Sequence, residues 1–315
     1  MAALESKVEG KSGSNQEYTN ALLQKLQSSL EGRFKRFVDE QIRAIEETKV
    51  KMVKKRRGVI HFFRVFPQFS SAVENIMATF HPGAVNVRHS INEDYGRILK
   101  AMFDSLRVIA RENKGIGVSA SSTDPEDKEA LNYHILLIEN LSYFIEEMQE
   151  MQQNHHVGVD VLEDRKQEAV QEYNKHLDQY LSSVMRRPLG KLLDYLENVE
   201  AQLQALKAPE RIAAQPSNSK TVFNKILGAY DAKEVRKGIE ALRKRIEKHF
   251  GDADEPGASV AAGGKELVEK VTEECEKFYG RVELRIASIT AEVYGGDVLF
   301  EWPRTEVRSA FAAAK

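Results

Sequence analysis

The first residues that could do chemistry form a basic cluster followed at once by an apolar and aromatic run. The cluster contains Lys49, Lys51, Lys54, Lys55, Arg56 and Arg57, and the run contains Ile60, Phe62, Phe63, Val65 and Phe66. Cations beside aromatic side chains can dock on an anionic membrane, each contributing about 1 kcal/mol near the surface. A solvated helix end followed by a core segment has the same pattern, and we favour core packing for the aromatics.

We favour the solvated helix end for the cations too, and the alternative hypothesis is a binding site for anionic lipids or acidic partners. The candidate residues are Lys51, Lys54, Lys55, Arg56 and Arg57. The same cations could serve a nucleic acid, but the formal net charge of -2 gives no support to bulk nucleic-acid binding. We therefore expect neither a nucleic acid nor a small-molecule substrate as a partner.

Motifs for catalysis and metal binding are incomplete. Gly10, Lys11 and Ser12 match the end of a phosphate-binding loop, but Glu5 stands where that loop needs its first Gly. None of the eight histidines follows a Glu by three residues, as a di-iron bundle requires. We expect His134, beside a core stripe, to be a packed and hydrogen-bonded histidine. The sequence predicts no catalytic residue, no metal site and no cofactor.

The cysteine count and the hydropathy bound the class of protein. Cys275 is the only cysteine, so an intrachain disulfide and a Cys-based zinc site are excluded and a reducing compartment is favoured. Its neighbours are mostly Glu, and we expect a bystander rather than a nucleophile. No apolar run approaches the roughly 20 residues that span a bilayer, and the polar N-terminus does not resemble a secretory signal.

The element around which the chain is organised is a helix that begins at residue 124, carries its apolar stripe to residue 148 and ends near residues 155–158. Asp124 fits an N-cap and Pro125 fits the first helical position. Apolar residues then recur at steps of three and four, and others widen the face: Leu131, Ile135, Leu137, Ile138, Leu141, Phe144, Ile145 and Met148. A face this wide must be covered by other helices.

Apolar periodicity predicts those other helices along the rest of the chain. They cover residues 16–57, 59–80 with a kink or break at Pro67, 85–113, 160–187, 189–208, 222–230, 231–250 and 265–294. Asp231 and Glu234 form a pattern like a capping box. Residues 215–219 are expected to be a linker and 251–264 a mobile connection. The fold class is all-α, with long antiparallel helices.

The domain organisation follows from these breaks. Residues 1–15 are rich in Gly, Ser and Lys and are expected to be disordered. We predict a first helical bundle over residues 16–156 and a second over 157–311.

Several stretches resemble one family, the C-terminal region of exocyst complex component one, the Sec-three type subunit of the vesicle-tethering exocyst. The likeness covers roughly residues 30–311, and the stretches that carry it are 37–50, 66–75, 100–110, 129–140 and 186–192. The family's lipid-binding and GTPase-binding domain lies N-terminal to this region, so the resemblance carries no lipid site to this chain, which we expect to be a fragment or a truncated paralogue.

The resemblance implies an elongated rod of stacked antiparallel helical bundles without enzymatic activity. It implies assembly with other exocyst subunits, in the cytoplasm and peripherally at plasma-membrane sites of secretion, where the complex holds vesicles before fusion. The alternative from the residues themselves is a peripheral module that recognises anionic phosphoinositide lipids through the basic cluster. A helical enzyme is the third alternative, which a deep pocket with convergent polar groups would favour.

Overall fold

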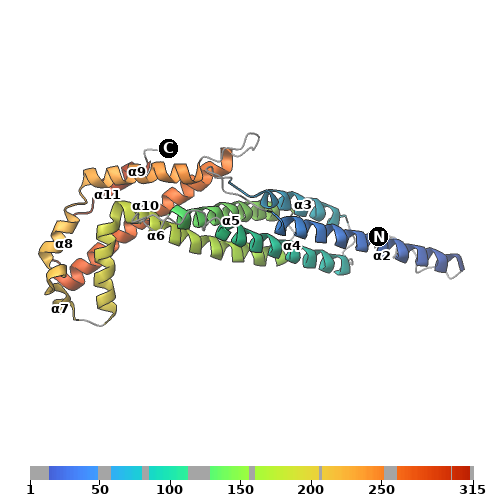
Figure 1. The fold of residues 1–315 in the computed structure, drawn as a ribbon, viewed down its shortest axis with the longest axis horizontal. Coiled ribbons are helices and arrows are strands. Elements are labelled where there is room, and N and C mark those ends of the chain that lie inside the picture. Colours follow the sequence, from blue (N-terminus) through green and yellow to red (C-terminus); the bar gives the residue numbers. More distant parts are fainter. Residues whose placement is uncertain are drawn as a thin grey trace. The chain divides into compact units, whose positions relative to one another are not determined.

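A computed structural model describes residues 14–48, 58–79, 85–112, 128–155, 160–205, 208–251, 261–298 and 300–312 of the chain. These residues form α-helices and one short 3-10 helix, and no strand occurs among them. The helices are α2 (Ser14–Glu46), α3 (His61–Met77), α4 (Val85–Glu112), α5 (Lys128–His155), α6 (Asp160–Gln204), α7 (Pro209–Ala213), η1 (Pro216–Asn218), α8 (Lys220–Leu227), α9 (Ala232–Phe250), α10 (Ala261–Tyr294) and α11 (Arg304–Ala312) (Figure 1). The predicted all-α class is confirmed.

The chain folds into two compact units, each of which packs mainly on itself. Unit 1 consists of residues 1–116 and 136–174, and unit 2 consists of residues 117–135 and 175–315. The division falls inside α5 and α6, so each of these helices gives residues to both units. Compactness of this kind does not test where an independently folding domain begins, so the predicted bundles over 16–156 and 157–311 stay a prediction.

The core of unit 1 is built around aromatic rings from three helices. Phe63 of α3 meets Phe103 of α4 and Phe144 of α5 edge to face, with ring centroids 5.9 and 6.1 Å away. Phe103 and Phe144 also meet edge to face at 5.3 Å. All three rings are buried, and this geometry is favourable because a positive ring edge faces a negative ring face.

The wide apolar face predicted for α5 is confirmed. Most of its members are buried: Leu131, Ile135, Leu137, Ile138, Leu141, Phe144 and Met148. Ile145 is only half-buried, so the face is narrower at that point than predicted. The proposed N-cap Asp124 and the following Pro125 lie outside the described residues.

The predicted break at Pro188 is wrong, and no break occurs at Pro67, while the alternative of a kink at Pro67 stays a prediction. α3 continues through Pro67, and α6 continues from Asp160 to Gln204 through Pro188. A proline inside a helix removes one backbone hydrogen bond, at a cost of about 3 kcal/mol. Burial of Val184 and Leu189, which flank Pro188, offsets that cost, because a fully buried aliphatic side chain contributes about 1.5–3 kcal/mol.

Two further helix bounds differ from the prediction. α2 ends at Glu46, and residues 49–57 of the predicted helix lie outside the described part. Thr48 takes up carbonyl groups of the last turn. Its N–H donates to Ile45 O at 3.1 Å and its hydroxyl donates to Ala44 O at 2.8 Å. α10 begins at Ala261, so the last four residues of the predicted mobile connection are helical, while residues 252–260 lie outside the described part.

Unit 2 is held by an aromatic stack and a buried amide. Phe223 of α8 stacks between Tyr195 of α6 and Tyr294 of α10, with ring centroids 5.0 and 5.2 Å away. The hydroxyl groups of Tyr294 and Tyr195 both donate to the backbone carbonyl of Asn218, at 2.5 and 3.4 Å. The side chain of Asn218 is fully buried, so this one residue of the segment 215–219, predicted as a linker, belongs to the core of the unit, while Pro216 and Ser217 are exposed.

Two predicted helix ends are confirmed in unit 2. The Asp231 carboxylate accepts a hydrogen bond from the backbone N–H of Glu234 at 2.8 Å and caps α9. α10 ends where Gly295 and Gly296 adopt φ angles of 62° and 81°, a left-handed conformation that glycine adopts without steric cost.

Candidate functional site

The basic cluster predicted to bind lipids or acidic partners is not described by the structure. Lys51, Lys54, Lys55, Arg56 and Arg57 all lie outside the described residues, so their assignment stays a prediction. The aromatic residues that follow are described, and Phe62, Phe63 and Phe66 are buried in unit 1. The expectation of core packing is confirmed for these three rings, which leaves them unable to contact a membrane. Val65 differs, because it is 41% exposed.

The most prominent apolar surface among the described residues lies on α2. Five large apolar side chains of this helix are exposed: Tyr18 (74%), Leu22 (47%), Leu26 (51%), Leu30 (54%) and Phe37 (42%). We call these five residues the α2 stripe. At 100° per residue they fall within a sector of about 120° around the helix, and at 1.5 Å per residue they extend about 28 Å along it.

Among the described residues, the helices that cover α2 reach only to about its middle (Figure 1). Past that point Val38 and Ile45 are buried, and Asp39 forms an ion pair with Arg97 of α4. The Phe37 ring lies 6.1 Å from the Phe69 ring of α3. Figure 1 shows the first half of α2 projecting beyond the ends of α3 and α4.

Contiguous exposed apolar surface of this kind marks an interaction site. Single exposed apolar residues are normal on a soluble protein, whereas a continuous row is rare unless a partner covers it. The amphipathic pattern of residues 16–45 was evident from the sequence, with Leu22, Leu26, Leu30 and Phe37 among its members. What the sequence did not show is that the neighbouring helices end before they cover it.

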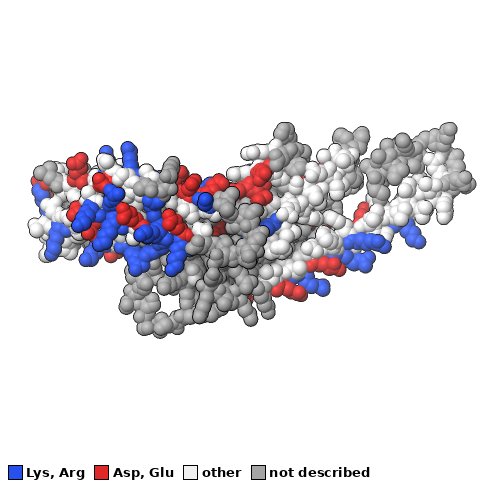
Figure 2. Space-filling model, turned by 90° about the horizontal axis from the view of Figure 1, so that it is seen from above, with Lys and Arg blue, Asp and Glu red and all other residues white. Residues whose placement is uncertain are grey.

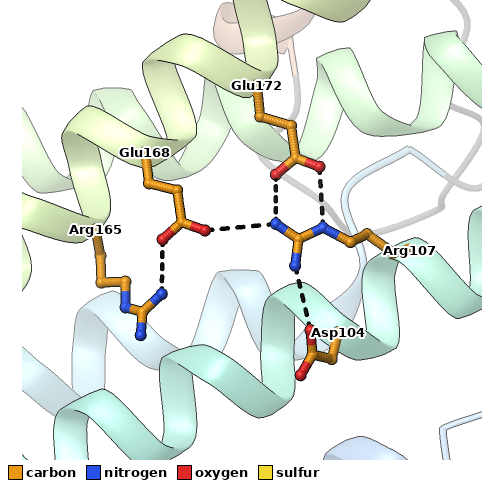
Figure 3. A network of polar contacts seen from close by, with 5 residues as sticks. All are labelled: Asp104, Arg107, Arg165, Glu168 and Glu172. Carbon is orange, nitrogen blue, oxygen red and sulfur yellow. Dashed lines mark hydrogen bonds and ion pairs between the residues drawn. The ribbon is translucent and has the colours of Figure 1, made fainter.

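Charged side chains on the described surface are mixed in sign, as Figure 2 shows for one face. Many of them pair across helices within one unit. In unit 1 the Arg107 guanidinium of α4 donates two hydrogen bonds to Glu172 of α6, at 3.0 and 2.8 Å, and a third to Asp104 at 3.2 Å (Figure 3). Glu168 lies 3.6 Å from Arg107 and also accepts from Arg165 at 2.6 Å. Such a network fixes α4 against α6 and accounts for these acids without a catalytic role.

The other residues that could do chemistry are buried or hydrogen-bonded within the fold. Cys275 is fully buried, and burial raises the pKa of its thiol, which opposes a role as nucleophile. His134 Nδ1 lies 3.0 Å from His176 Nδ1, so the expectation of a packed, hydrogen-bonded histidine is confirmed. Among the described residues no group of three potential ligands is placed to hold a metal ion. None of the described helices is both long and apolar enough to cross a bilayer.

A pocket of about 470 Å³ opens in unit 2 between α6, α9 and α10. Its lining includes the buried Tyr279, together with Arg187, Lys237 and Arg245. A deep pocket with convergent polar groups is the feature that would favour a helical enzyme. Burial raises the pKa of the Tyr279 hydroxyl, so at neutral pH this group holds its proton and can donate a hydrogen bond, but it cannot act as a base.

Comparison with known proteins gives one consistent match. Residues 1–296 match the family model for the C-terminal part of exocyst complex component Sec3. The chain is similar to exocyst complex component 1 of Mus musculus, with 26% identity over 69% of the chain and 21% of the relative. Proteins of the same name in Drosophila melanogaster and Dictyostelium discoideum are 27% and 23% identical, over 70% and 74% of the chain and 22% and 24% of the relatives.

The chain therefore spans about a fifth of the length of the curated relatives it matches. No solved structure matches it significantly.

Proposed function

The chain belongs to the Sec3 C-terminal family of exocyst subunits, and on that premise we propose that it is a non-catalytic scaffold whose α2 stripe packs against a helix of another exocyst subunit. The observation that carries this proposal is the exposure of Tyr18, Leu22, Leu26 and Leu30 along one side of a helix that the described helices of its unit do not cover.

Burial of apolar surface would supply the binding free energy. A large apolar side chain taken fully out of water contributes about 1.5–3 kcal/mol, and the α2 stripe holds five partly exposed ones. Association costs part of this gain through lost rotational and translational freedom. A row of anchors at helical spacing is the pattern with which one helix binds in the apolar groove of a partner.

The wider role that we propose follows from the family. The relatives bear the name exocyst complex component 1, and the resemblance implies a complex that holds secretory vesicles at the plasma membrane before fusion. In this proposal the chain acts on the cytoplasmic side of that membrane as part of a rod of stacked helices. It contributes distance and side-chain surface, with no reaction of its own.

The test compares two triple variants of the full chain in its native cells. Leu22→Glu, Leu26→Glu and Leu30→Glu place three charges on the α2 stripe. The matched control carries Asn20→Glu, Gln24→Glu and Ser28→Glu, which add the same charge to exposed positions on the opposite side of the same helix. Circular dichroism and thermal unfolding of both purified variants establish that they are folded.

The stripe variant should lose co-purifying exocyst subunits by about tenfold or more, equivalent to about 1.4 kcal/mol of binding free energy. The control should retain them at the level of the unmodified chain. Equal recovery by the two folded variants would reject the α2 stripe as the contact, and recovery of no exocyst subunit by the unmodified chain would reject the scaffold role.

A further inference from the structure

The pocket in unit 2 has apolar residues in its lining and a glycine at a close approach of two helices. Leu189 of α6 and Val235 and Leu242 of α9 line it and are buried. A Cβ atom added to Gly238 would come within 3.3 Å of Pro188 Cβ and 4.0 Å of the Tyr279 hydroxyl oxygen. Gly238 therefore lets α9 approach Pro188 of α6 and the Tyr279 hydroxyl of α10 closely.

Tyr279 carries a buried hydroxyl group that the fold leaves unsatisfied. Its side chain is fully buried, and its hydroxyl has no hydrogen-bond partner among the described residues. The ring itself is well packed, 5.6 Å from the ring of Phe311 and 6.2 Å from that of Trp302. Because burial keeps this hydroxyl protonated, it is a donor without an acceptor. A buried unsatisfied donor is costly, so an acceptor that enters the pocket gains a strong hydrogen bond.

The pocket lining carries more positive than negative charge. Arg187, Lys237 and Arg245 line the pocket together with a single acid, Glu234. α9 as a whole carries seven basic residues, Lys233, Arg236, Lys237, Arg243, Lys244, Arg245 and Lys248, against three Glu at 234, 240 and 247. At the left of Figure 2, Lys and Arg side chains are interspersed with Asp and Glu side chains. The field at the pocket therefore favours an anionic ligand.

We propose that this pocket binds a carboxylate side chain of a partner protein, in a peptide segment that places an apolar residue next to the acid. The carboxylate accepts the hydrogen bond of the Tyr279 hydroxyl and lies near Arg187 and Lys237. The neighbouring apolar side chain contacts Leu189 and Val235. This lining favours a peptide over a phosphate group, because a phosphate offers no apolar surface to bury there.

The site goes beyond the scaffold role, since it names the chemistry of a second contact that involves no residue of α2. Its test uses the purified chain of 315 residues and two displayed peptide libraries. One library fixes a central Glu followed by an apolar residue, with random residues on both sides. The matched library has Gln in place of Glu. Selected peptides are then measured for affinity to the wild type and to two variants.

Tyr279→Phe removes only the hydroxyl group, and Tyr18→Phe does the same at an exposed position of α2 as the control. Because the Tyr279 hydroxyl has no partner in the fold, the melting temperature of Tyr279→Phe should equal or exceed that of the wild type. Loss of a hydrogen bond to a charged acceptor should weaken the selected Glu peptides by about tenfold or more, whereas Tyr18→Phe should leave their affinity unchanged.

Recovery of no Glu peptide by the wild type would overturn the proposal. It would also be overturned if the Glu and Gln libraries gave equal affinities, or if Tyr279→Phe bound the selected peptides as well as the wild type. Each of these outcomes is independent of exocyst assembly, so the scaffold role and the pocket stand or fall separately.

Discussion

Arg285 on α10 and Glu200 on α6 form a two-pronged ion pair, in which Nε and Nη2 donate to the two carboxylate oxygens at 2.7 Å each. The pair is partly shielded from solvent, since the two side chains are 27% and 32% exposed. Hydrogen bonding to Glu200 holds the pKa of the Arg285 guanidinium above its ordinary value. The ion pair joins α6, the longest of the described helices, to α10 within unit 2.

We predict that Glu200→Gln destabilises the chain by about 1–2 kcal/mol, because bidentate charge-assisted hydrogen bonds are stronger than neutral ones. Urea denaturation followed by circular dichroism measures the change. Glu240→Gln is the matched control, since the pair of Glu240 with Arg236 is 53% and 54% exposed and such surface pairs contribute about 0–1 kcal/mol. Equal effects of the two substitutions would mean that the Arg285 pair is no more than a surface contact.

Asn140 satisfies a backbone group at the start of another helix. Its side-chain oxygen accepts from the N–H of Ile60, before α3, at 2.8 Å, and its amide donates to Leu136 O at 2.8 Å. Asn140→Ala should cost about 1–3 kcal/mol, because the buried N–H of Ile60 is then left without a partner. Asn132→Ala, at an exposed position of the same helix, should change stability by less than about 0.5 kcal/mol. If Asn140→Ala lost less stability than Asn132→Ala, the role of Asn140 at the start of α3 would be contradicted.

Glu163 makes stability depend on acid pH. Lys166, Gln152 and Gln167 donate hydrogen bonds that lower the pKa of this carboxyl to about 2 from 4.5. A depressed folded pKa stabilises the fold above the unfolded value, and this contribution is lost as the pH falls from 4.5 toward 2. Because the side chain is 36% exposed, Glu163→Gln should cost at most about 1 kcal/mol at pH 7.

The measurement is urea denaturation of the wild type and of Glu163→Gln at pH 7, 5, 4 and 3. The difference in unfolding free energy between the two proteins should be largest at pH 7. It should shrink below about pH 4.5, because the wild-type protein then loses the stabilisation that the ionised carboxyl provides. Glu301→Gln, at an exposed carboxyl, is the control and should show a small difference at every pH. A difference for Glu163→Gln that stays constant from pH 7 to pH 3 would contradict the assignment.

Tyr294 donates to the backbone carbonyl of Asn218 at 2.5 Å, which gives the short helix η1 a partner in the core. Tyr294→Phe keeps the stack with Phe223 and removes this donor, so we predict a loss of about 1–2 kcal/mol in thermal or urea unfolding. The exposed Tyr18→Phe should have no measurable effect. If neither substitution changed the unfolding free energy, the hydrogen bond from Tyr294 to the carbonyl of Asn218 would not contribute to stability.

Local pattern predicted much of the fold because the helices are amphipathic and long. Val235, Ile239, Leu242 and Ile246 recur at helical spacing and are all buried in α9. The cap at Asp231 depends on residues three positions apart, so the sequence alone was enough to find it. The stripe of α5 was predicted for the same reason.

What local pattern missed depends on packing between distant residues. Helix α6 continues through Pro188 because residues far apart in sequence bury its neighbours, and no window around the proline contains that information. Local pattern predicts that Asn218 is a linker residue. It lies in the core instead, where Asn198 and Tyr294 donate hydrogen bonds to it. The exposure of Leu26 likewise depends on where α3 and α4 end, which a single helix pattern does not reveal.

The central claim is that the α2 stripe contacts another exocyst subunit, and site-specific photo-crosslinking in cells tests it most directly. A benzophenone side chain replaces Leu26 in the stripe or Gln24 on the opposite side of α2, both exposed. Mass spectrometry then identifies the crosslinked peptides. The account predicts that position 26 crosslinks to a helix of another exocyst subunit and that position 24 does not. Crosslinks from position 24 alone, or none to an exocyst subunit from position 26 while the complex co-purifies, would contradict it.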